Sequence, residues 1–337
     1  MSETTTISII LPTKDTAPYL SDCIDSILSQ TFENWELIAV NDQSSDNSLE
    51  ILEQYAAQDS RIHVLNNPTA GLLETLRYGY DHSTGGLIHR MDSDDIMPAY
   101  KLQTMYDALM LHGIGTVITG GTQYFSDEGE VGDGFKRYDA WLCEVARENT
   151  HAKNIFRECV IPSNCWLVYR EDFDFCGGFN NDVFPEDYDL CFRFHKGQLK
   201  IVGLDCVLHH WRDRSDRISR NWDCYKDNRF FEIKLCYFCE LKRDQDRPLV
   251  LWGAGKNGKD LAKLLLSHVG PFTWICDNDN KIRKDIYGIV MQPISILEEL
   301  HNPQIIVAVA SPDGQVEIRQ HLDTLNKVEG EDYWLFS

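Results

Sequence analysis

Apolar runs of strand length alternate with amphipathic segments through the first ninety residues of this chain. Four runs predict buried strands: 7–11, 35–40, 62–65 and 87–91. The segments between them repeat apolar side chains at helical spacing, as Leu20, Ile24 and Ile27 do. Strand–helix alternation at this spacing produces right-handed βαβ units. The pattern therefore predicts an α/β fold around a mostly parallel, Rossmann-like sheet.

Three carboxylates follow the run at 87–91 within four residues, at Asp92, Asp94 and Asp95. Such a cluster repels itself unless water or a cation neutralises it. Hard oxygen ligands at the end of a buried strand suit Mg²⁺ or Mn²⁺. The alternative is a solvated acidic turn that caps the helix expected near Pro98.

Two other polar residues also lie just beyond predicted strands, Thr13 after the first and Asp42 after the second. In a parallel sheet the carboxyl ends of the strands meet at one edge, and ligands bind there. Each residue alone would pass for an ordinary loop residue. Because both belong to the edge that carries the acidic cluster, we expect a joint binding site.

The next hundred residues add a second acidic pair. Residues 126–134 are rich in Gly and Asp and predict a hairpin-like turn. Further on, Glu186 and Asp187 follow Pro185 at the start of a predicted helix. First-turn carboxylates complement the helix dipole, which would explain the pair without any function.

Four arginines, at 212, 214, 217 and 220, follow a predicted strand in an otherwise acidic part of the chain. They are either a solvated basic face or a clamp for a diphosphate, since a guanidinium grips phosphate oxygens well. Arg212 is the preferred clamp because it lies nearest the strand end.

The tail carries a second, independent pattern. A short strand leads into G-x-G-x-x-G at Gly253, Gly255 and Gly258, and a further strand ends in Asp277. This spacing matches the dinucleotide fingerprint, although glycines also serve tight strand–helix packing. We expect a catalytic domain at 1–220, a helical linker at 221–247, and a small Rossmann-like βαβ domain of unknown role at 248–337.

Composition limits the classes of partner. The 337 residues carry a net charge of −21, which argues against binding nucleic acid or other polyanions. The first residues have neither a basic start nor an apolar signal core, so we expect a cytoplasmic protein. Eleven cysteines scattered through apolar segments fit reduced thiols in that compartment.

Taken together, the motifs resemble those of the family-2 glycosyltransferases of GT-A fold, bacterial enzymes that elongate surface polysaccharides. The matching stretches are I-S-I-I-L-P-T at 7–13, V-N-D-Q-S-S-D at 40–46, R-M-D-S-D-D-I at 90–96, G-G-F at 177–179, P-E-D-Y-D-L-C-F-R at 185–193 and W-R-D-R-S-D-R-I-S at 211–219. They cover about residues 5–220 in the family's order.

The resemblance implies an inverting transfer from a nucleotide-diphosphate sugar, by family frequency a UDP-sugar, to a hydroxyl of a glycan or lipid-linked acceptor. A lipid-linked acceptor would bring the enzyme to the inner face of the membrane. By the same resemblance Thr13 and Asp42 hold the nucleotide, and Asp92 and Asp94 meet the metal and the diphosphate.

The remaining roles follow in the same way. Asp187 would be the catalytic base, with Glu186 as its fallback, and Arg90 and Arg212 would bind substrate. Two positions depart from the family pattern: Arg214 stands where many relatives have His, and Arg77 where many have Asn. A metal contact from position 214 is therefore in question.

Three other functions compete. A sugar-nucleotide-making nucleotidyltransferase would need a Gly-rich basic loop after the first strand, and residues 12–15 lack one. An NAD-linked oxidoreductase built on Gly253 to Asp277 has no visible catalytic partner domain. A non-catalytic binding protein is disfavoured by the intact acids at 92–95 and 186–187.

Overall fold

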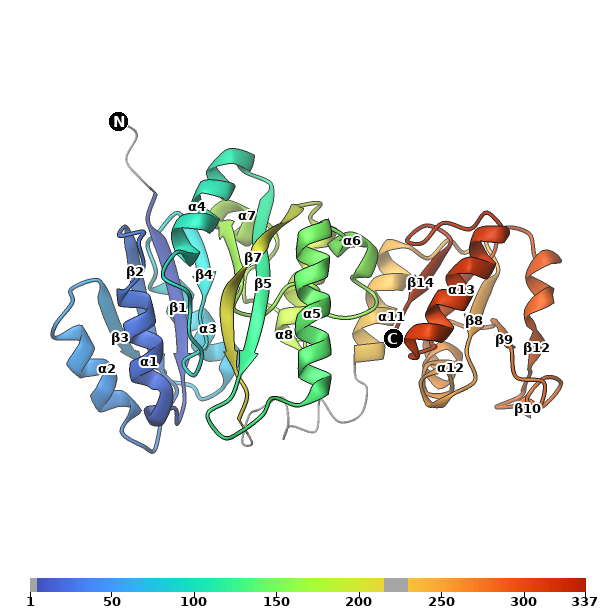
Figure 1. The fold of residues 1–337 in the computed structure, drawn as a ribbon, viewed down its shortest axis with the longest axis horizontal. Coiled ribbons are helices and arrows are strands. Elements are labelled where there is room, and N and C mark those ends of the chain that lie inside the picture. Colours follow the sequence, from blue (N-terminus) through green and yellow to red (C-terminus); the bar gives the residue numbers. More distant parts are fainter. Residues whose placement is uncertain (1–4, 215–229) are drawn as a thin grey trace. The chain divides into compact units, whose positions relative to one another are not determined.

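The computed structural model describes residues 5–214 and 230–337, so Arg217, Arg220 and the first part of the expected linker lie outside the described residues. Contacts divide the chain into two compact units. Unit 1 comprises Met1–His151 and Val160–Asn221, and unit 2 comprises Ala152–Cys159 and Trp222–Ser337. Figure 1 labels the elements of both units, and each unit is described by itself.

Unit 1 is built on a seven-stranded sheet in the order β3-β2-β1-β4-β6-β5-β7. Its strands are β1 (Ile7–Thr13), β2 (Trp35–Asn41), β3 (Ile62–Asn66), β4 (Leu87–Arg90), β5 (Thr116–Phe125), β6 (Trp166–Tyr169) and β7 (Lys200–Arg212). The pairs β1–β2, β1–β4 and β2–β3 are parallel, as the alternation predicts. Strand β6 is antiparallel to both β4 and β5.

The helices of unit 1 fall between these strands. They are α1 (Ala17–Leu28), α2 (Ser48–Ala56), α3 (Leu72–Asp81), α4 (Lys101–His112), α5 (Asp133–Glu148), α7 (Arg170–Phe175) and α8 (Glu186–Lys196), and α6 (His151–Asn154) spans the junction with unit 2. The hairpin expected at 126–134 is wrong, because α5 begins at Asp133 and β5 pairs with β6 and β7 instead.

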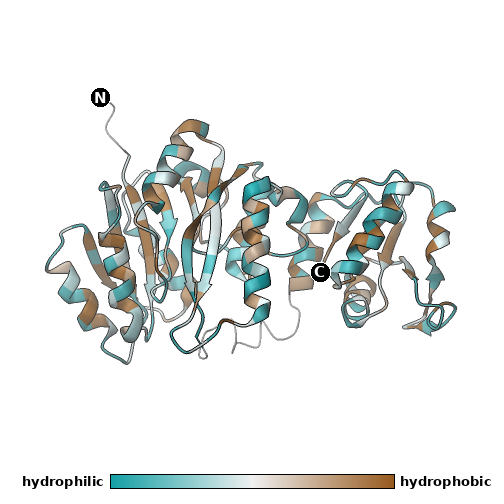
Figure 2. Ribbon diagram, viewed as in Figure 1, coloured by the Kyte–Doolittle hydropathy of each residue, from teal (hydrophilic) through white to brown (hydrophobic). Residues whose placement is uncertain are grey.

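The main core of unit 1 lies between one face of the sheet and the helices α1, α2 and α4. Alternate residues of β1, such as Ile7 and Ile9, are fully buried in it, while Ile10 faces the opposite side. Figure 2 shows hydrophobic colouring along these strands and mixed colouring on the helices, as amphipathic helices require. The α/β fold class is therefore confirmed.

Unit 2 has its own parallel sheet of five strands in the order β12-β9-β8-β13-β14. Its elements are α11 (Phe230–Leu241), β8 (Leu249–Trp252), α12 (Lys256–His268), β9 (Thr273–Cys276), β10 (Asp285–Ile286), β11 (Ile289–Val290), β12 (Gln292–Pro293), the 3₁₀ helix η1 (Ile294–Glu298), β13 (Gln304–Val307), α13 (Pro312–Thr324) and β14 (Tyr333–Leu335). This is the small Rossmann-like domain that the tail predicts. Across the described part of both units, no helix is long and apolar enough to cross a membrane.

Close packing of α5 on β7 depends on Gly203, so a larger residue there should destabilise unit 1. A Cβ added at Gly203 would lie 2.3 Å from the carbonyl oxygen of Ala146, which only a backbone shift could relieve. We expect Gly203→Ala to lower the free energy of unfolding by about 1–3 kcal/mol, as overpacking does. Urea unfolding followed by circular dichroism measures it.

Gly134 is the matched control, because it lies in α5 and a Cβ there meets nothing within 4 Å. Gly134→Ala should be neutral or stabilise by up to about 1 kcal/mol, the usual gain for alanine in a helix. Equal effects of the two substitutions would contradict the packing argument.

Candidate active site

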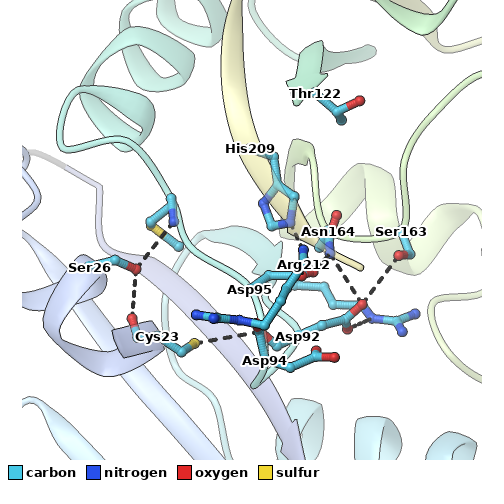
Figure 3. Close-up of polar contacts among 12 residues, drawn as sticks. Cys23, Ser26, Asp92, Asp94, Asp95, Thr122, Ser163, Asn164, His209 and Arg212 are labelled. Carbon is cyan, nitrogen blue, oxygen red and sulfur yellow. Dashed lines mark hydrogen bonds and ion pairs between the residues drawn. The ribbon is translucent and has the colours of Figure 1, made fainter. Parts of the chain in front are cut away.

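The loop after β4 carries the acidic cluster at the carboxyl end of the sheet, as expected from the sequence (Figure 3). Each of its three carboxylates has polar partners. Asp92 lies near the start of β6, where its Oδ2 accepts hydrogen bonds from Asn164 Nδ2 at 3.2 Å and Ser163 Oγ at 3.4 Å. These donors and the neighbouring arginines offset the repulsion among the three carboxylates.

Arg90 joins the acidic loop to helix α8. Its Nε lies 2.9 Å from Asp92 Oδ1 and its Nη1 lies 2.9 Å from Glu186 Oε1. Arg90 is the last residue of β4 and is 5% exposed, so both ion pairs are largely shielded from water. The neighbouring carboxylates of Asp92 and Glu186 raise the pKa of Arg90 further above its already high usual value, against the effect of burial. The two acidic motifs thus share one buried cation.

Asp95 anchors the loop and is fully buried. Its Oδ1 accepts the backbone N–H of Arg212 at 2.8 Å, and its Oδ2 accepts Asn164 Nδ2 at 2.6 Å. The same Oδ2 lies 3.0 Å from His209 Nε2, and His209 Nδ1 lies 3.2 Å from the buried Lys101 Nζ. Burial lowers the pKa of Lys101 to about 8. This network makes Asp95 a structural member of the cluster.

Asp94 lies beside two arginines from the end of β7. Its Oδ2 is 3.0 Å from Arg214 Nε, and its backbone oxygen accepts Arg212 Nε at 2.8 Å. The Arg212 guanidinium also pairs with Asp22, at 2.9 Å, and with Asp127. Arg212, the expected diphosphate clamp, is therefore at the edge predicted for it but is held by carboxylates on both sides.

The capping interpretation of the acidic cluster does not agree with the structure. Helix α4 begins at Lys101 after Tyr100, and its N-terminus has no side-chain capping hydrogen bond. The cluster is instead built into the sheet edge through Arg90, Asn164 and His209. A binding site at this edge remains the better interpretation.

Glu186 and Asp187 form the first turn of α8, as the sequence predicts. Asp187 is partly exposed, and its Oδ1 accepts the backbone N–H of Tyr188 at 2.8 Å. Burial and then the adjacent Glu186 carboxylate raise the pKa of Asp187 to about 7. Glu186 Oε2 is buried and has no hydrogen-bond partner among the described residues. A carboxyl group that titrates near neutrality can act as a general base.

Thr13 ends β1 and Asp42 directly follows β2, and the two are linked through the backbone, where Asp42 N donates to Thr13 O at 2.8 Å. Asp42 is buried, and its carboxylate accepts Asn67 Nδ2 at 3.1 Å and Gly71 N at 3.0 Å. The buried Thr13 Oγ1 has no hydrogen-bond partner in the part of the chain described. The loop after β1 reaches the acidic loop, since Thr16 and Ser93 are hydrogen-bonded through their hydroxyls at 2.9 Å.

Comparison with known proteins assigns the chain to a family. The model of "Glycosyl transferase family 2" matches residues 8–174. The glycosyltransferase GlyG of Streptococcus pneumoniae is 28% identical over 64% of this chain and 73% of its own length. The putative glycosyltransferase EpsE of Bacillus subtilis is 35% identical over 68% of this chain and 81% of its own length. The chain belongs to glycosyltransferase family 2.

Other relatives match shorter parts of the chain. The putative teichuronic acid biosynthesis glycosyltransferase TuaG of Bacillus subtilis is 30% identical over 34% of this chain and 46% of its own length. Solved structures agree on the fold. Residues 1–349 of Staphylococcus aureus TarS, in complex with UDP-GlcNAc, align over 79% of this chain and 73% of that one with a TM-score of 0.53 at 16% identity.

The mannosyltransferase PcManGT of Pyrobaculum calidifontis, in complex with GDP-Man and Mn²⁺, aligns over 80% of this chain and 72% of that one, with a TM-score of 0.54 at 16% identity. At these identities the likeness concerns the fold alone. The sheet of unit 1 is thus that of the GT-A glycosyltransferases.

Several residues of the candidate site were not expected from the sequence. Ser163 and Asn164 orient Asp92, while Lys101 and His209 support Asp95. Asn164 lies just before β6, and β6 runs antiparallel, so its beginning lies at the edge where parallel strands end. An antiparallel reversal leaves no local mark in the sequence, which is why Ser163 and Asn164 were missed.

The fingerprint of the tail is preserved in unit 2. Gly258 is required for packing, because a Cβ there would lie 2.0 Å from the backbone oxygen of Gly253. At Gly255 a Cβ would meet nothing within 4 Å. Asp277 follows β9 and is exposed. Open space at the second glycine suits a pyrophosphate, so a dinucleotide on unit 2 stays a prediction.

The raised pKa of Asp187 makes stability depend on pH. An unfolded aspartate titrates near about 4, so the folded chain binds more protons than the unfolded chain between about pH 4 and pH 7. Stability contributed by this group is therefore lost as the pH rises through that window. The free energy of unfolding of Asp187→Asn, relative to that of the unmodified protein, should therefore rise by about 1–2 kcal/mol from pH 5 to pH 8. This figure is discounted for the partial exposure of Asp187.

Urea unfolding of both proteins at the two pH values measures this gain. If the difference in unfolding free energy between the two proteins is the same at pH 5 and pH 8, Asp187 titrates at its ordinary pKa.

Proposed function

We propose that this family-2 glycosyltransferase moves a sugar from a nucleotide-diphosphate sugar, with UDP as the preferred nucleotide, to a hydroxyl of a glycan or lipid-linked acceptor. We place the reaction in bacterial surface-polysaccharide synthesis and expect inversion at the anomeric carbon. The observation that carries the proposal is the Arg90 bridge. It joins Asp92, a diphosphate-side carboxylate, to the Glu186–Asp187 pair that would serve the acceptor.

The comparisons support the substrate class. TuaG is described as a teichuronic acid biosynthesis enzyme, and the TarS structure contains UDP-GlcNAc. A lipid-linked acceptor would bring the protein to the membrane surface.

For the donor we assign Thr13 and Asp42 to the nucleotide. The Thr13 hydroxyl is buried and has no partner among the residues that the structure describes, and a base or ribose group would supply one. We assign Arg212 to the diphosphate, since guanidinium groups bind phosphate oxygens in pairs. Its carboxylate partners Asp22 and Asp127 are more than half exposed, and the diphosphate would take their place on the guanidinium.

Asp92 and Asp94 would hold a divalent cation, Mg²⁺ or Mn²⁺. Both side chains remain partly accessible, at 21% and 13% exposure. Among the described residues no three His, Cys, Asp or Glu side chains gather as a metal site, so the donor's oxygens and water would complete the shell. When bound, such a cation supplies positive charge that stabilises the departing diphosphate.

We assign Asp187 as the general base. Its Oδ1 is engaged by the Tyr188 N–H, so Oδ2 would take the proton of the acceptor hydroxyl. The acceptor oxygen then forms a bond to the anomeric carbon while the bond to the donor's phosphate oxygen breaks. The nucleoside diphosphate leaves with that electron pair, and one such displacement inverts the configuration.

The rival functions have less support. A nucleotidyltransferase would need a Gly-rich basic loop after β1, and residues 14–16 are Lys, Asp and Thr. For unit 2 we infer a docking or regulatory role in place of oxidoreductase chemistry, since the described residues beside its glycine loop include no evident catalytic acid–base pair.

The first prediction of this proposal concerns the metal. Purified protein given a panel of UDP- and GDP-sugars with Mn²⁺ should release nucleotide from at least one donor, and EDTA should abolish the release. Asp94→Asn should weaken Mn²⁺ and UDP binding together, as calorimetry would measure. Full turnover in EDTA would remove the metal from the mechanism, and no turnover or stabilisation with any donor would count against the function.

The second prediction concerns Asp187. Asp187→Asn keeps the shape of the side chain but cannot accept a proton, so we expect transfer to fall about 10²–10⁴-fold with near-normal donor binding. Loss of a first-turn carboxylate alone would cost only about 0.3–1 kcal/mol of stability. Product analysis by chromatography measures the rate, and NMR of the product gives the anomeric configuration.

Asp182→Asn is the control for that change of charge. Asp182 is exposed and pairs with Arg77 outside the acidic cluster, so its loss should leave transfer within a few-fold. Transfer by Asp187→Asn at the control's rate would refute the assignment, and a retained configuration would refute single displacement.

A further inference from the structure

Asp92 and Asp94 are both neutralised by arginines, but the two arginines are held in very different ways. Arg90 is 5% exposed and bridges two carboxylates, so moving it away from both would leave Glu186 buried without a compensating charge. Arg214 lies after the end of β7 and pairs with Asp94 through Nε. Its carboxylate partner, Asp94, is one of the two that the proposed function gives to the cation.

The Arg214–Asp94 pair is shielded enough to matter energetically. The side chains are 12% and 13% exposed, and the guanidinium also lies 5.1 Å from the centre of the Tyr19 ring. Shielded pairs are screened less by salt and water than surface pairs. A divalent cation approaching Asp94 would therefore meet both an occupied oxygen and a like charge close by.

A bound donor would offer Arg214 an alternative partner. Arg212, its neighbour two residues earlier, shares the Tyr19 ring and pairs with Asp22 and Asp127. These carboxylates are already engaged, whereas a nucleoside diphosphate would bring unsatisfied phosphate oxygens to the same edge. Guanidinium groups bind phosphate at least as well as carboxylate.

We propose that Arg214 is an internal counter-ion that holds Asp94 until the donor binds and then transfers to the diphosphate. This inference rests on the proposed function. Arg214 suppresses cation binding to the empty site, and the donor removes that suppression. Cation and donor therefore bind cooperatively, and by linkage each tightens the other by the same factor. Arg214 is a positioning residue in this scheme, since it acts through Asp94.

The test measures Mn²⁺ affinity without any turnover. Free Mn²⁺ is followed by electron paramagnetic resonance during titration of the full-length protein, with and without UDP. In the absence of UDP, Arg214→Gln should bind Mn²⁺ about tenfold or more tightly than the unmodified protein. Added UDP should raise Mn²⁺ affinity more in the unmodified protein than in Arg214→Gln.

Two further variants separate charge, geometry and folding. Arg214→Lys keeps the charge but loses the planar guanidinium, so its Mn²⁺ affinity should be intermediate. It also serves if Arg214→Gln does not fold. Arg147→Gln makes the same change in net charge at an exposed pair with Glu148 on α5, and it should leave Mn²⁺ affinity unchanged.

The outcomes distinguish this proposal from the function on which it rests. Mn²⁺ affinity unchanged or weakened in both Arg214 variants, with normal metal-dependent transfer, would overturn the counter-ion role alone. If Arg214→Gln and Arg147→Gln gain Mn²⁺ affinity equally, the gain reflects net charge alone, and the counter-ion role is also overturned. Absence of Mn²⁺ binding in every protein, even with UDP, would overturn the metal site and the counter-ion role together.

Discussion

The buried bridge from Arg90 to Asp92 and Glu186 is the interaction on which the rest of the site depends. It joins residues that are 96 positions apart in sequence and fixes the start of α8 against the end of β4. Removing one partner would leave charge buried without compensation, which typically costs about 3–5 kcal/mol. The bridge therefore makes the geometry of the site inseparable from the folding of unit 1.

Much of this arrangement could be predicted from the sequence, because local periodicity reports burial directly. The strands β1 to β4 and their helices follow from apolar runs and helical spacing, and chain direction in βαβ units then places Thr13, Asp42 and Asp92 at one edge. The first-turn position of Asp187 followed from Pro185 and the acids after it. These inferences needed only short-range information.

The remainder needed long-range information that the sequence does not display. Strand β6 inserts antiparallel between β4 and β5, and this reversal brings Asn164 to Asp92 and Asp95. Helix α5 was missed because its Gly- and Asp-rich beginning resembles a turn, although its later residues are amphipathic. The arginine partners of the acids were likewise undetermined, since any of several arginines could have reached them.

Charge is the constraint that these pairings resolve. A chain with net charge −21 should repel a nucleoside diphosphate, and its proposed site contains still more carboxylates. Arg90, Arg212 and Arg214 offset that repulsion at the edge where the proposed donor would bind. Asp187 is the acid whose charge these arginines do not offset, because burial and Glu186 raise its pKa more than the attraction of Arg90 lowers it. A site that neutralised every acid equally well would be more stable, but it would lack a carboxylate basic enough to accept a proton near neutral pH.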